Sequence, residues 1–129
     1  MKFRIVAVLI IFLLTSCATS IDSVKGGKEY GESRTFNTTF ENAWIYTKKI
    51  FLESGVEIVK FNRGKGEIFG SKSLSLFSYG SYIGVWISEV SDSTANITVY
   101  TKRVLATQIS SGFSESNYYD KFKIYVEAE

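Results

Sequence analysis

The sequence contains no histidine, no proline and only one cysteine, Cys17. The absence of histidine removes the most common general base, the Ser-His-Asp triad and most transition-metal sites. The absence of proline removes X-Pro turns and slow prolyl isomerisation during folding. We therefore expect no metal and no cofactor, and an enzyme built on this chain would need carboxylate, serine, tyrosine or lysine chemistry.

The chain also lacks an excess of charge. Its 15 basic and 13 acidic residues give a formal net charge of +2, but Lys2 and Arg4 lie in an N-terminal segment that we expect to be removed. The remaining basic residues equal the acidic ones in number, and close basic neighbours such as Lys48 and Lys49 form pairs rather than patches. Nucleic-acid-binding domains usually carry a clustered basic face. The sequence therefore predicts no nucleic-acid partner.

The composition is that of one folded domain rich in sheet. Hydrophobic residues make up 45% and charged residues 22% of the chain, as in globular proteins. Ten phenylalanines, eight tyrosines and many β-branched residues favour strands. A chain of 129 residues can bury a real core, but it is too short for two ordinary domains.

The N-terminus has the layout of a secretory signal peptide. Lys2 and Arg4 form a positive region, and Ile5–Leu14 is an uninterrupted apolar run of ten residues. A membrane-spanning helix needs about 20 apolar residues, so this run is too short to remain as an anchor. We expect residues 1–16 to be cleaved from the mature protein.

The four residues Leu14-Thr15-Ser16-Cys17 resemble the lipobox of bacterial lipoproteins, in which a branched residue and two small residues precede a cysteine. The resemblance implies a diacylglyceryl group on the sulfur of Cys17, cleavage just before it, and acylation, commonly with palmitate, of the new amine. Two or three acyl chains hold a protein on a bilayer far more firmly than one. The alternative is an unmodified cysteine after an ordinary signal, or a buried core thiol.

The same resemblance implies the membrane to which the lipoprotein is sorted. In Gram-negative members of the family an aspartate after the cysteine favours the inner membrane, and this chain has Ala18. The resemblance therefore implies a lipid anchor on the periplasmic side of the outer membrane, the alternative being the outer face of the plasma membrane. Residues 17–32 are predicted to be the lipidated N-terminus and a flexible tether, with a root-mean-square span of about 20 Å.

Residues 33–129 are predicted to form the folded domain. Thr38 and Glu41 have the spacing of a capping box, and Gly55 suits a left-handed helix terminator. Between them, apolar residues recur at helical spacing; they are Phe40, Ala43, Trp44, Thr47, Ile50 and Phe51. The predicted strands are residues 34–40, Val56–Phe61, Glu67–Leu74, Ile83–Val90 and residues 95–102.

The last segment, residues 115–128, fits two periods. Phe122, Ile124 and Val126 alternate as in a strand, whereas Tyr118 and Phe122 are spaced as in a helix. We favour a helix because Ser114 offers a cap.

The predicted fold is therefore an α+β two-layer sandwich, with an antiparallel sheet of four to five strands and one or two helices on one face. Its topology is similar to small domains of Gram-negative envelope lipoproteins, such as the helix-grip domains of the barrel-assembly machinery and the lipoprotein of the lipopolysaccharide-assembly complex.

No catalytic residues are predicted. Glu53 with Glu57, and Glu89 with Asp92, are the closest carboxylate pairs, but they sit at a helix end and at a turn rather than across a cleft. Lys72 lies between two serines on a predicted strand, where adjacent side chains point to opposite faces. These residues are better explained as solvated surface.

An aromatic and glycine-rich stretch is the only candidate binding surface in the sequence. If Tyr79, Tyr82 and Trp86 are exposed, they would suit an envelope protein or glycan partner, because tyrosine and tryptophan dominate binding hot spots. In the alternative, these rings fill the core while neighbouring glycines relieve crowding.

The predicted function is a non-enzymatic, lipid-anchored binding or assembly module. The alternatives are a small envelope hydrolase using carboxylate or serine chemistry, and an occluding, immunity-type lipoprotein.

Overall fold

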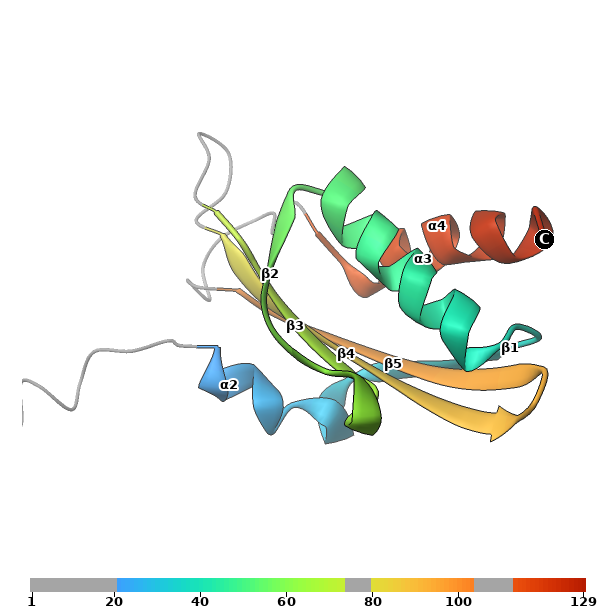
Figure 1. Cartoon of the computed structure of the whole chain (residues 1–129). Coiled ribbons are helices and arrows are strands. Elements are labelled where there is room, and N and C mark those ends of the chain that lie inside the picture. The colour runs from blue at the N-terminus through green and yellow to red at the C-terminus, as the bar shows by residue number, and fades with distance from the viewer. Residues whose placement is uncertain (1–20, 74–79, 104–112) are drawn as a thin grey trace, which may run out of the picture.

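The computed structural model of the chain describes residues 21–73, 80–103 and 113–129 and contains one antiparallel sheet with the strand order β1-β5-β4-β3-β2 (Figure 1). The strands are β1 (Glu32–Phe36), β2 (Val56–Asn62), β3 (Glu67–Lys72), β4 (Ser81–Ser91) and β5 (Thr94–Arg103). The helical elements are α2 (Asp22–Lys25), η1 (Lys28–Tyr30), α3 (Phe40–Glu53), η2 (Arg63–Lys65) and α4 (Glu115–Glu127). The predicted α+β fold is confirmed, because α3 and α4 both cover one face of the sheet.

Helix α3 follows the predicted apolar stripe, but it is capped one residue later than the sequence indicates. Thr39 is the N-cap and accepts a hydrogen bond from the Asn42 amide at 3.1 Å. The predicted cap, Thr38, is buried instead and donates to the Glu129 carboxylate at 2.6 Å. Both threonines can cap a helix, so the contact with the far end of the chain decides between them. Gly55 ends the helix with φ +70°, as predicted.

Helix α4 confirms the helical interpretation of the last segment. Ser114 accepts a hydrogen bond from the Asn117 amide at 3.1 Å, which satisfies one free donor of the first turn. Tyr118 and Phe122 are fully buried, whereas Ile124 is 65% exposed. A strand with the alternating period would have buried Ile124 together with Phe122, so the exposure of Ile124 marks the helical face that points to solvent.

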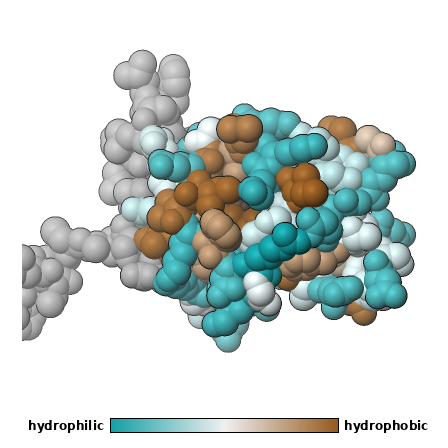
Figure 2. Space-filling model, in the orientation of Figure 1, coloured by the Kyte–Doolittle hydropathy of each residue, from teal (hydrophilic) through white to brown (hydrophobic). Residues whose placement is uncertain are grey.

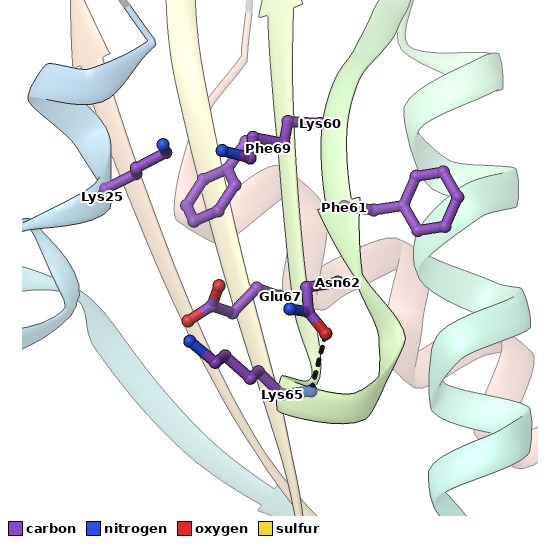
Figure 3. Close-up of a pocket in the computed structure, with 7 residues that line it drawn as sticks. All are labelled: Lys25, Lys60, Phe61, Asn62, Lys65, Glu67 and Phe69. Carbon is purple, nitrogen blue, oxygen red and sulfur yellow. Dashed lines mark hydrogen bonds between the residues drawn. The ribbon is translucent and has the colours of Figure 1, made fainter.

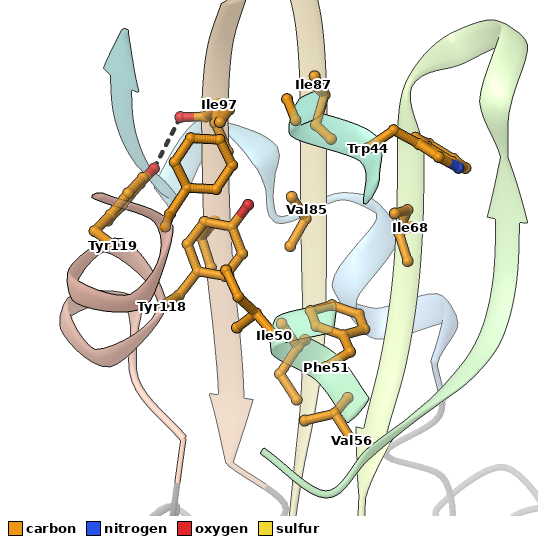
Figure 4. Close-up of a cluster of buried hydrophobic side chains, with 14 of the residues drawn as sticks. Trp44, Ile50, Phe51, Val56, Ile68, Val85, Ile87, Ile97, Tyr118 and Tyr119 are labelled. Carbon is orange, nitrogen blue, oxygen red and sulfur yellow. Dashed lines mark hydrogen bonds between the residues drawn. The ribbon is translucent and has the colours of Figure 1, made fainter. Parts of the chain in front are cut away.

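The main core lies between the sheet and the two long helices (Figure 4). It includes three buried side-chain hydrogen bonds. The Thr47 hydroxyl donates to the Ala43 carbonyl at 2.8 Å, so it accepts from the Tyr118 hydroxyl at 2.7 Å. Burial raises the pKa of Tyr118, which keeps this hydroxyl a donor. The neighbouring Tyr119 hydroxyl donates to the Ile97 carbonyl at 2.8 Å. These contacts fasten α4 to both α3 and β5.

A second, smaller cluster lies on the opposite face of the sheet, where α2 and η1 pack (Figure 1). Val24 has no exposed surface and packs with Phe69 and Trp86. Gly84 makes room for this contact, because a β-carbon there would lie 2.8 Å from Val24 and 2.6 Å from Trp86. The predicted flexible tether is therefore wrong for residues 21–32, which fold onto the sheet. Residues 17–20 lie outside the described residues.

In the sequence of β5, apolar residues at 95, 97 and 99 alternate with polar residues or tyrosine at 96, 98 and 100, which predicts one buried side and one side that faces water. The packing of the N-terminal segment corrects the second part of this prediction. Ala95, Ile97 and Val99 are buried on the helix side, as the alternation predicts. The other side was predicted to face water, but Thr98 is only 4% exposed and Tyr100 is half-buried. The N-terminal segment covers this face, so both sides of β5 are packed.

Candidate functional site: a lysine-lined pocket beside α2

The predicted aromatic surface does not form as a set. Trp86 is only 6% exposed and meets Phe69 edge-on at a ring distance of 5.7 Å. Tyr82 is half-buried and packs against the same cluster. Tyr79 lies outside the described residues. The two rings that are described belong to the packing between the sheet and α2, as in the alternative interpretation of this stretch.

A pocket of about 310 Å³ opens on this same side of the sheet (Figure 3). Residues from four elements line it: Lys25 of α2, Lys60, Phe61 and Asn62 of β2, Lys65 of η2, and Glu67 and Phe69 of β3. In Figure 3 the side chains of Lys25 and Lys60 reach inward from opposite walls, with the Phe69 ring beneath them. Glu67 and Lys65 occupy the other end.

Local structure fixes the walls of this lysine pocket. The Asn62 side chain accepts a hydrogen bond from the Lys65 amide at 3.2 Å and so caps η2. The turn closes at Gly66, whose φ of +68° favours glycine. The floor is rigid because Phe69 is 2% exposed and wedged against Trp86. The pocket is therefore a built feature of the β2-β3 hairpin, to which α2 adds Lys25.

The charge of the lysine pocket is positive. Three lysines and one glutamate line it, with no other ionisable side chain among the lining residues, so its formal charge is +2. The sequence gives no sign of this cluster, because its lysines are residues 25, 60 and 65, which form no basic run. These three lysines come together only because α2 docks on the sheet and because β2 and β3 form a hairpin.

A second pocket, of about 380 Å³, bears on the hydrolase alternative. Glu53, Ser54, Asp120 and Lys121 are among its lining residues, and the Lys121 ammonium donates to the Ser54 hydroxyl at 3.1 Å. An acyl-transfer site also needs N–H donors for the oxyanion. The Ser54 amide is already bonded to the Ile50 carbonyl, and the next amide, that of Gly55, is bonded to the Leu52 carbonyl at the end of α3.

The position of Ser54 opposes oxyanion stabilisation for another reason. It caps the C-terminal end of α3, where the helix dipole is negative. A developing oxyanion would be disfavoured there, whereas the Lys121 ammonium is stabilised. The Ser54–Lys121 contact is thus better explained as a link between the C-terminal end of α3 and the middle of α4 than as a catalytic dyad.

The β2 edge of the sheet is partly apolar. Val59 is 52% and Phe61 63% exposed, and Figure 2 shows apolar surface interrupted by polar side chains on this side of the molecule. The register shifts between Ile58 and Lys60, which places a bulge at Val59. Bulges and lysines discourage edge-to-edge strand pairing, so this edge is poorly suited to bind a partner strand.

Two features are absent from the described ranges, namely a cluster of metal-binding side chains and a membrane-spanning helix. Among residues 21–73, 80–103 and 113–129, no three histidine, cysteine, aspartate or glutamate side chains come together as a metal site. In that same part of the chain, no helix combines the length and apolar character needed to cross a bilayer.

The chain matches no known family model, no curated protein and no solved structure. The function of the protein is therefore inferred from its residues and from the geometry of the lysine pocket.

Proposed function

We propose that this protein is a lipid-anchored, non-enzymatic binding or assembly module of the bacterial cell envelope, held at the periplasmic face of the outer membrane. The lipobox-like Leu14-Thr15-Ser16-Cys17 and the Ala18 that follows support the anchor and the sorting. The observation that carries the proposal furthest is the docking of α2, because the chain joins the folded domain at Ile21, which packs against the second cluster.

Only three residues then separate Cys17 from the folded domain. Four residue steps span at most about 14 Å, so acyl chains on Cys17 would hold the domain against the bilayer surface. Tethering at such short range raises the effective concentration of the domain toward anything else on that surface. Its role would be to present a binding site there, to an envelope protein, a glycan or the membrane itself.

Mass spectrometry of the mature N-terminus tests the anchor. We expect Cys17 as the first residue with acyl chains attached, and the protein in the membrane fraction. Cys17→Ser should abolish acylation and change fractionation, whereas the matched variant Thr19→Ser should leave both unchanged. An unacylated native protein in the aqueous fraction would overturn the proposal.

Co-purification from detergent-solubilised envelopes tests the binding role. Partners retained by the native protein should be depleted when Cys17→Ser is used as bait, because the domain is no longer concentrated at the membrane. Equal partner recovery, together with unchanged membrane fractionation of the variant, would contradict the proposed mechanism.

A further inference from the structure

We infer that the lysine pocket binds the phosphate of an anionic phospholipid headgroup in the membrane that holds the chain; this inference rests on the proposed lipid anchor. The pocket brings together Lys25, Lys60 and Lys65, and Lys is a compact charge that binds phosphate well. In Figure 3 the amide nitrogen of Asn62 lies on the pocket side, because its oxygen caps η2. It provides a neutral donor beside the ammonium groups.

The size of the lysine pocket fits a headgroup rather than a whole lipid. Its volume of about 310 Å³ is at the small end of the usual range for ligand pockets, about 300–1,000 Å³. Phe69 closes the floor and is itself buried. Acyl chains would therefore stay in the bilayer while the polar group enters the pocket.

The position of the pocket makes the membrane the source of the phosphate. Lys25 belongs to α2, and α2 begins directly after Ile21, where the chain enters the domain. An anchor at Cys17 lies at most about 14 Å from Ile21, which brings this face of the sheet toward the headgroups. The opposite face is covered by α3 and α4 (Figure 1). Free phosphate has the same chemistry but no such preference for position.

One residue in the pocket opposes the anion. The Glu67 carboxylate lies among the lysines and weakens the positive potential. Replacing it with glutamine should strengthen headgroup binding, whereas replacing Lys60 and Lys65 should weaken it. Changes of opposite sign at neighbouring positions distinguish an electrostatic site from simple damage to the fold.

The experiment uses the mature lipoprotein, purified from membranes and placed in nanodiscs of phosphatidylcholine alone or of phosphatidylcholine with phosphatidylglycerol. Acetylation rates of individual lysines are measured by mass spectrometry. We expect Lys25 to react about five-fold more slowly when phosphatidylglycerol is present. Lys48 of α3 and Lys123 of α4 should react at the same rate in both lipids and serve as internal controls.

Variants and free anion complete the test. The protection of Lys25 by phosphatidylglycerol should disappear in Lys60→Gln/Lys65→Gln, increase in Glu67→Gln, and remain in the matched variant Lys48→Gln/Lys123→Gln. Inorganic phosphate added to phosphatidylcholine nanodiscs should not protect Lys25. Protection by inorganic phosphate alone would overturn the lipid as the source.

The same samples distinguish a failure of the headgroup inference from a failure of the proposed lipid anchor. If the mass spectrum shows acylated Cys17 but phosphatidylglycerol does not slow the acetylation of Lys25, the inference is wrong and the anchor stands. If the pocket lysines and Lys48 are protected equally, adsorption is non-specific and the inference is also wrong. If Cys17 is unacylated and the protein stays in the aqueous phase, the proposed function itself fails.

Discussion

Replacing Val24 should release α2 and η1 from the sheet without unfolding the rest of the domain. Val24 is fully buried against Phe69 and Trp86, and this cluster shares no residue with the main core. Val24→Ala removes two methyl groups at about 0.8 kcal/mol each, or about 1.6 kcal/mol, which raises the detached population roughly 15-fold. Val24→Asp should detach the segment fully, because an unpaired carboxylate among these rings costs several kcal/mol more.

Hydrogen exchange and tryptophan fluorescence measure the detachment. The Gly27 amide donates to the Val24 carbonyl at 2.8 Å, so its protection should fall in both variants. Trp86 emission should move to longer wavelength when its cover leaves, measured in a Trp44→Phe background so that only one indole reports. Val90→Asp is the control, because Val90 is 61% exposed.

Two results would refute the reasoning. If Val24→Asp keeps the protection of Gly27 and the emission of Trp86, the segment is not held by Val24. If Val24→Asp instead removes the far-ultraviolet circular dichroism of the whole domain, the segment is not a separable unit. In either case the short spacer and the orientation inferred from it lose their support.

Three further predictions concern the main core, the C-terminus and the β2-β3 turn. In chemical denaturation, Thr47→Val should lower the free energy of unfolding by about 1–3 kcal/mol, because it leaves the buried Tyr118 hydroxyl without its acceptor. Tyr118→Phe should lower it by less, about 0.5–1.5 kcal/mol. Equal losses would contradict the assignment of Tyr118 as the donor to Thr47. The hydrogen bond from Thr38, together with others, lowers the pKa of Glu129 below 4.5, so this contact adds stability above that pH and loses it as the pH falls through the lowered pKa. Glu129→Gln should therefore lower the free energy of unfolding by at most about 1 kcal/mol near neutrality, since the carboxylate is exposed, and a difference that grows below pH 4.5 would refute this. Gly66→Ala should destabilise by more than about 1 kcal/mol, because φ is +68° and a β-carbon would overlap a β4 carbonyl; unchanged thermal unfolding would disprove it.

The parts of the fold that sequence reasoning found are those governed by local pattern. Helix α3 has buried residues at helical spacing over 14 residues and Gly55 at its end. The hairpin of β2 and β3 has a glycine at the left-handed position of its turn. In both cases neighbouring residues provide the signal, so no knowledge of distant contacts is needed.

The errors all come from contacts between distant segments. Ile21 and Val24 are isolated apolar residues among charges and glycines, so no periodicity marks them. They dock because Gly84 leaves room and Trp86 provides a wall, about 60 residues later in the chain. The lysine pocket was missed for the same reason. Residues this far apart in sequence become neighbours only through the sheet, which the composition and spacing of the N-terminal segment do not reveal.

The docking of α2 determines whether weak attraction between three lysines and anionic headgroups can orient the domain on a membrane. A fully flexible tether of residues 18–32 would let the domain turn freely over a span of about 20 Å, and three lysines would then meet headgroups only occasionally. Because Ile21 packs against the sheet, a chain anchored at Cys17 as proposed would keep the lysine pocket within reach of the membrane surface. Each lysine near an anionic surface contributes only about 1 kcal/mol, too little to recruit a free protein against the loss of its translational freedom. The acyl anchor proposed on Cys17 would already account for that loss, so the same contacts would then suffice to decide which face of the domain lies on the membrane.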